Sequence, residues 1–289
     1  MRVSAVHRQW WAVWLAGLLA LTACTRMDLA YRNLDTLIPW TLDDYLDMNR
    51  EQKAWFEGQL ADHLRWHCQT QLPGYLPWLD RLQSLVATQN ATDETLQALT
   101  RDGEEAAEAI ARQITPSAVE LLQNLDHEQV SALREAFAKD IAKRKREQVS
   151  PPLAEQIQTR AEKMHGRLKP WLGRISPEQD AAIARWASQL GDHNRLAVDN
   201  RERWQQALLS ALDHRHEPGF EARVTQLLQR RQALWSEAYR ADRANSQAAA
   251  RALTQAVLQT SDADQRQQLM AQLEKLRERF SALKCLKKQ

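Results

Sequence analysis

Two histidines four residues apart are the first residues whose spacing suggests chemistry. On a helix, His63 and His67 would lie one turn apart on the same face, which is the spacing of a zinc-binding pair. A zinc-protease motif would also need a glutamate directly after the first histidine, and Leu64 stands there. We therefore favour two half-buried histidines packed beside Trp66, and we expect no metal and no cofactor.

The N-terminal segment has the three parts of a secretory signal. Arg2 and Arg8 supply positive charge, no acidic residue is present, and an uncharged apolar run covers residues 10–20. This run is shorter than the roughly 20 apolar residues that a membrane-spanning helix needs. We therefore predict that residues 1–23 are a signal peptide that is removed.

The sequence Leu21-Thr22-Ala23-Cys24 resembles the bacterial lipobox, in which a branched apolar residue and two small residues precede an invariant cysteine. The resemblance implies a diacylglycerol on the thiol of Cys24, cleavage before it and acylation of the new amine. An aspartate just after the cysteine would be the usual inner-membrane retention signal, and Thr25 and Arg26 stand there instead. The resemblance thus points to the periplasmic face of the outer membrane. The alternative is an uncleaved apolar helix with a chance cysteine.

Lipidation of Cys24 would leave two cysteines, Cys68 and Cys285, in an oxidising compartment. We predict one disulfide between them, which would join an early helix to the C-terminal tail. Cys68 continues an apolar stripe at four-residue spacing, whereas Cys285 lies off the stripe of the last helix. The pairing therefore requires either that the last helix ends near Leu283 or that the tail turns back, and two free thiols are the alternative.

Charge and aromatic content narrow the possible partners. The chain has 39 Lys and Arg against 37 Asp and Glu, and the signal segment holds two arginines and no acid, so residues 24–289 are balanced. This balance gives no electrostatic case for binding nucleic acid. The basic run 143–146 could contact anionic lipid headgroups, although such runs are usually a solvated helix face. Most tryptophans after the signal should pack in the core, and an exposed subset would mark a binding groove.

Composition predicts an all-α fold. Glycine and proline number only eight and nine in 289 residues, and good helix formers dominate. We expect a bundle of nine or ten helices over residues 24–289, either as one domain or as two abutting lobes with a corner near residue 150. Pro39 and Pro116 should interrupt helices.

Four expected helix starts share one pattern, in which a capping residue is followed three positions later by a side chain that reaches back. The pairs are Asn49 with Gln52, Asp126 with Gln129, Ser176 with Gln179, and Ser261 with Asp264. The pattern is similar to the Leu-Thr-x-x-Gln motif of Spy and CpxP, which are helical periplasmic chaperone and stress-response proteins. Capping alone also explains it, because helix starts in water gain from such boxes.

Residues 27–81 resemble a family of uncharacterised Gram-negative lipoproteins known only as a domain of unknown function. The residues that carry the resemblance are Asp28–Asp35, Ile38–Trp40, Leu42–Leu46, His63, Trp66–Cys68, the Leu72-Pro73 corner and Trp78-Leu79. The lipobox and the near-terminal Cys285 fit the same family. The resemblance implies lipidation and a helical fold, and it brings no activity.

We therefore expect a non-enzymatic, lipid-anchored module that faces the periplasm. It would contact the membrane through the lipid on Cys24 and serve envelope interaction or maintenance, with an envelope protein as a possible partner and no nucleic acid. One alternative is a Spy-like chaperone, which would show an exposed apolar concave face. Another is an envelope hydrolase, which would show a closed pocket with convergent carboxylates or the two histidines.

Overall fold

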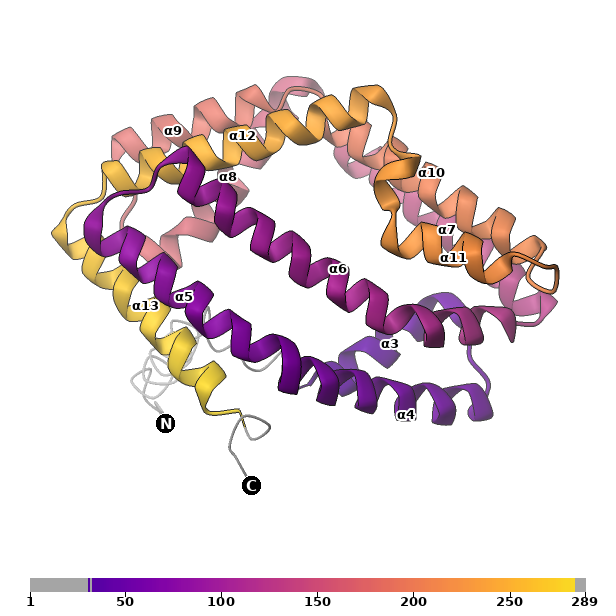
Figure 1. Cartoon of the computed structure of the whole chain (residues 1–289). Coiled ribbons are helices and arrows are strands. Elements are labelled where there is room, and N and C mark those ends of the chain that lie inside the picture. The colour runs from indigo at the N-terminus through magenta and orange to yellow at the C-terminus, as the bar shows by residue number, and fades with distance from the viewer. Residues whose placement is uncertain (1–30, 32, 284–289) are drawn as a thin grey trace, which may run out of the picture.

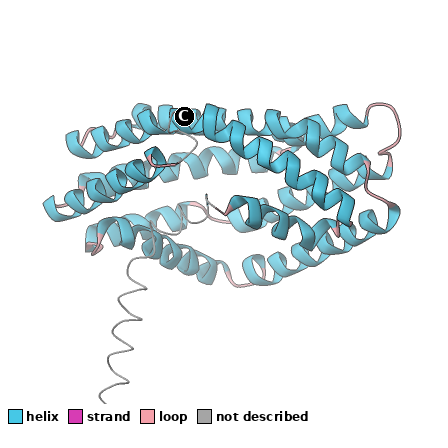
Figure 2. Ribbon diagram, turned by 90° about the horizontal axis from the view of Figure 1, so that it is seen from below, coloured by secondary structure: helices cyan, strands magenta, loops and turns pink. Residues whose placement is uncertain are grey.

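The computed structural model describes residue 31 and residues 33–283, and every regular element in these ranges is a helix (Figures 1 and 2). The α-helices are α3 Leu34–Leu46, α4 Arg50–Trp66, α5 Leu72–Thr88, α6 Asp93–Gln123, α7 His127–Arg144, α8 Leu153–Leu172, α9 Pro177–Gln189, α10 His193–Asp213, α11 Phe220–Gln229, α12 Glu237–Gln259 and α13 Ala263–Ser281. Two π-helical segments, η1 His67–Gln71 and η2 Lys145–Val149, and one 3-10 helix, η3 Arg231–Leu234, complete them. The prediction of an all-α bundle is confirmed.

Neither proline that we expected to interrupt a helix does so. Helix α3 continues through Pro39, and α6 runs for 31 residues through Pro116. A proline inside a helix removes one backbone donor. Near Pro116, the hydroxyl of Thr115 donates a 2.6 Å hydrogen bond to the carbonyl of Ala111. Buried leucines lie on both sides of Pro116 in α6, so we attribute the unbroken helix to tertiary packing.

The expected corner at Leu72-Pro73 is instead a continuous passage from α4 through η1 into α5. In this π-turn the amide of Leu72 donates to the carbonyl of His67, five residues back. Pro73 follows at once in the first turn of α5. Counting α4, η1 and α5 as one rod gives ten helices among the described residues, within the nine or ten expected.

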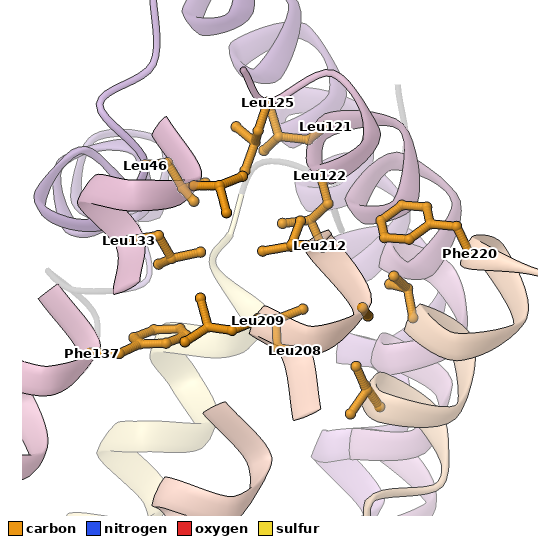
Figure 3. Close-up of a cluster of buried hydrophobic side chains, with 14 of the residues drawn as sticks. Leu46, Leu121, Leu122, Leu125, Leu133, Phe137, Leu208, Leu209, Leu212 and Phe220 are labelled. Carbon is orange, nitrogen blue, oxygen red and sulfur yellow. The ribbon is translucent and has the colours of Figure 1, made fainter. Parts of the chain in front are cut away.

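The largest core joins α3, α6, α7, α10 and α11. Figure 3 shows Leu122 of α6 pointing toward Leu212 of α10, with Leu46 and Leu133 nearby. A second core joins α5, α6, α12 and α13, and a third joins α8, α9, α12 and α13. The first two cores each combine residues from before and after position 150. Long helices therefore lie side by side, as α13 does along α5 in Figure 1.

The four capping boxes are joined in two pairs through their glutamines. Gln52 and Gln129 exchange amide hydrogen bonds of 3.1 and 2.7 Å, and Gln179 and Gln265 exchange bonds of 3.0 and 2.9 Å. Each glutamine oxygen also accepts from the backbone amide of its own cap residue. Three of the amide nitrogens also donate to a backbone carbonyl three residues before the partner's helix. The amide nitrogen of Gln179 donates instead to the carbonyl of Val257, near the end of α12. The same joint is thus built twice, at opposite ends of the molecule in Figure 1.

Three of the four predicted capping boxes are confirmed, and the fourth is shifted by one residue. Asp262 caps α13 and Gln265 reaches back to it, in place of Ser261 and Asp264. Ser261 is buried, and its hydroxyl donates at 2.6 Å to the carbonyl of Val257 near the end of α12. The serine therefore completes the preceding helix and leaves the next cap to the aspartate.

Replacing Gln179 by alanine is expected to lower the free energy of unfolding by about 2–4 kcal/mol. Gln179 is fully buried, and its loss would leave the amide of Gln265 and the backbone amide of Ser176 short of partners, at about 1–3 kcal/mol per buried group. Urea unfolding measures the effect. Gln189→Ala, at an exposed position of the same helix, is the matched control and should change stability by under about 0.5 kcal/mol. Equal effects of the two variants would contradict the structural role of the pair.

Candidate functional site

The first described residue, the π-turn and the end of the last helix meet at one place. His67, at the start of η1, lies between two tyrosines: its Nδ1 is 3.1 Å from the hydroxyl of Tyr31, and its Nε2 is 3.1 Å from the hydroxyl of Tyr75. The ring of Tyr31 also contacts Phe280 of α13, with centroids 6.4 Å apart. This cluster ties the N-terminal end of the described chain to both α4–α5 and α13.

Burial favours the neutral form of the central histidine. It lowers the pKa of His67, and it raises the pKa of Tyr31 and of Tyr75. A neutral imidazole has one donor and one acceptor nitrogen, and here each nitrogen already faces a tyrosine hydroxyl. His67 therefore acts as a structural hydrogen-bonding centre, with no ring nitrogen left for a metal.

The structure gives the other histidine of the pair a separate role. The Nε2 of His63 lies 2.5 Å from the hydroxyl of Ser117 in α6, and burial lowers the pKa of this histidine although Asp62 acts in the opposite direction. The rings of His63 and His67 therefore contact different residues. Within the described ranges, no three or more His, Cys, Asp or Glu side chains are grouped so that they could hold a metal ion.

Cys68 lies in the π-turn and is only 4% exposed. It packs with Leu72 and with Leu283, which follows the end of α13 at Ser281. The last helix thus ends where the predicted disulfide requires it to end. Both Cys24 and Cys285 lie outside the described residues.

Only part of the prediction for the tryptophans agrees with the structure. Five of them pack onto the edges of the cores: Trp55, Trp78, Trp171, Trp186 and Trp204. All five are half-buried, and two donate their indole N–H to backbone carbonyls. Trp40 differs from the others, because 75% of it is exposed.

Exposed apolar side chains gather on α3, the first described helix. Leu37 and Trp40 both lie on its surface. Beside them is a cleft of about 420 Å³, lined by Trp40, Met48 and Phe56 together with charged residues that include Asp43 and Lys53. Asp43 and Lys53 form an ion pair of 2.9 Å across the two helices. The cleft is therefore an apolar surface with a charged rim, next to the N-terminal end of the described chain.

Sequence reasoning misses the tyrosines that hold His67 and the pairing of the glutamines. Tyr75 is eight residues from His67, and the π-turn changes the register between them, so helical spacing alone does not relate the two. The repeated helix-start pattern was the available signal for the glutamines, because all four starts carry a glutamine three residues after the cap once Asp262 takes the place of Ser261.

These features define a helical protein with a pair of hydrogen-bonded capping glutamines at each end and an exposed apolar surface on its first described helix. The chain matches the model of a family of unknown function, DUF6279, over residues 44–240, and it belongs to that family. No curated protein and no solved structure matches it. Among the described helices, none is both long and apolar enough to cross a membrane.

Proposed function

We propose that this protein is a lipoprotein of the outer membrane, anchored through Cys24, that faces the periplasm and acts by binding another envelope component rather than by catalysis. The observation that carries the proposal is how soon the folded body begins after the lipobox. Tyr31 is seven residues from Cys24 and is already held against His67. Seven residues span at most about 25 Å, so a lipid on Cys24 would hold the helices close to the bilayer.

The exposed surface of α3 supports an interaction role at this end. Leu37 and Trp40 follow the anchor closely in sequence and are the exposed large apolar residues nearest to it. Isolated exposed apolar residues are common, but an exposed tryptophan beside an apolar cleft is typical of a contact surface. We propose that this surface receives an envelope protein partner.

The two alternative functions, an envelope hydrolase and a Spy-like chaperone, would each need a different kind of site from the exposed surface of α3. A hydrolase built on the histidines would need their rings to converge on a pocket. Instead the two rings face different partners, His63 through its Nε2 the hydroxyl of Ser117, and His67 the hydroxyls of two tyrosines. A Spy-like chaperone would need a broad apolar concavity. The large exposed apolar residues of the described ranges lie instead on three helices, as Leu37 and Trp40 on α3, Ile114 on α6 and Leu153 on α8.

Crosslinking in living cells tests the proposal. A photoreactive amino acid placed at position 40 of the full-length chain should capture one dominant envelope protein. The control is the same amino acid at position 139, because Lys139 lies on α7 with 80% of its side chain exposed, and it should not capture that protein. A broad set of unfolded envelope proteins at position 40 would overturn the proposal in favour of the chaperone. Identical capture at both positions would also contradict it.

A further inference from the structure

A second cleft, remote in sequence from the lipobox, is rich in arginine. It has a volume of about 450 Å³, which lies in the range of small-molecule sites. Its charged lining residues are Arg144, Arg201, Arg231 and Arg243. No carboxylate belongs to its lining among the described residues.

One carboxylate behind the cleft serves two of the four guanidinium groups. Asp140 lies 2.9 Å from Arg144 and 2.7 Å from Arg201. Burial alone would raise the pKa of Asp140, but the hydrogen bonds and charges of the two arginines outweigh it and lower the pKa below its ordinary value. Asp140 therefore stays ionised and fixes both arginines at the wall of the cleft.

The other two arginines have no acidic partner in the described part of the chain. Arg231 lies over the ring of Trp204, at 5.6 Å from its centroid, and Arg243 lines the cleft from α12. With four guanidinium groups and one carboxylate between them, the cleft has a clear excess of positive charge. Such an excess favours a ligand with more than one negative charge.

Aromatic rings form another part of the wall. Trp204 is fixed by a 2.9 Å hydrogen bond from its Nε1 to the carbonyl of Leu227. Trp235 and Tyr239 meet edge to face, with centroids 5.4 Å apart. Asn200 also lines the cleft, and its buried Oδ1 has no hydrogen-bond partner among the described residues. The cleft thus offers flat apolar surface beside its positive charge.

Both irregular helices of this region contribute to the cleft. The π-helical segment η2 supplies Gln148, and the 3-10 helix η3 supplies Arg231 and Leu234. Departures from regular α-helix inside a helical protein are frequent at functional sites. Here η2 and η3 each place their own side chains on the wall of the cleft.

We propose that this cleft binds an organic phosphate, in which a phosphate group is joined to a sugar or another ring. Guanidinium forks match phosphate oxygens in pairs, and the ring would lie on the tryptophans. The basic run 143–146 joins this site only through Arg144, because Lys145 pairs with Glu202 at 2.7 Å. This inference goes beyond the proposed function and does not depend on lipidation. The phosphate could belong to a lipid headgroup or to a free small molecule.

Calorimetric titration of the detergent-solubilised full-length protein with phenyl phosphate tests the site. We expect saturable binding that Arg231→Gln and Arg243→Gln each weaken about tenfold or more, as loss of a charged contact does. Arg185→Gln is the matched control, since it removes the same charge from an exposed position of α9. It should change affinity less than about twofold. Absence of saturable binding, or equal weakening by the control, would overturn the proposal.

A competition arm distinguishes the two sources of phosphate. Dihexanoyl phosphatidic acid, used below its micelle concentration, should displace phenyl phosphate if the site accepts a lipid headgroup. If it competes much more weakly, the natural ligand is a free organic phosphate. Displacement by dihexanoyl phosphatidylcholine, which has no phosphomonoester, would contradict recognition of phosphate by the arginines.

Discussion

A chain in which Cys24 is replaced by serine is expected to lose acylation completely. Serine cannot form the thioether that would carry the diacylglycerol. The measurement is incorporation of labelled palmitate. The parent chain should carry label and sediment with the membranes, because several acyl chains give durable attachment.

The matched control is Cys68→Ser, which removes a cysteine far from the lipobox. This variant should keep its label, although we expect it to be less stable. Acyl label on the Cys24→Ser chain would show that lipid is attached elsewhere, and it would remove the basis for the anchor.

Loss of the predicted disulfide is expected to lower the free energy of unfolding by about 2–5 kcal/mol, which is typical for a native bridge. Leu283 packs in the same cluster as Cys68. Cys285 is two residues further along the chain, a step of at most about 7 Å, so the short tail is long enough to reach the same cluster. The bridge would join η1 to the tail that follows α13, and it would thereby close a very long loop of the chain.

Denaturant unfolding of Cys68→Ala and Cys285→Ala measures this effect. Both variants should lose similar stability, and reductant should lower the stability of the parent but add little to either variant. If only Cys68→Ala lowers the free energy of unfolding, the effect comes from burial of the Cys68 side chain and not from a bridge. Thiol titration of the denatured, unreduced parent should find no free thiol, and two titratable thiols would contradict the bridge.

Local features of the fold could be predicted from the sequence. Helix formers, capping residues and four-residue apolar spacing act within a few positions, so the helical class, three capping boxes and the burial of Cys68 follow from them. The prediction that Ser261 caps the last helix was wrong because its hydroxyl donates to the carbonyl of Val257, which competes with its use as a cap. The prediction of a helix break at Pro116 was wrong for a different reason, since packing on both sides of the proline holds α6 together.

Contacts between distant residues could not be predicted in this way. Gln179 and Gln265 are 86 residues apart, and no local rule says that two capping glutamines will pair. The arginine cleft combines Arg144 with Arg243, from helices that only the folded chain brings together. Each of these residues has an ordinary local explanation, as a cap or as a surface charge, so the sequence pattern alone does not indicate the site.

Mass spectrometry of the N-terminal peptide tests the central claim most directly. The full-length protein, expressed in a Gram-negative host and purified from separated outer membranes, should yield a peptide that begins at Cys24, lacks residues 1–23 and carries the mass of a diacylglycerol with a further acyl group. A peptide that begins at Met1, or one that begins elsewhere with an unmodified Cys24, would contradict the lipid anchor. It would also remove the argument that places the folded helices close to the bilayer.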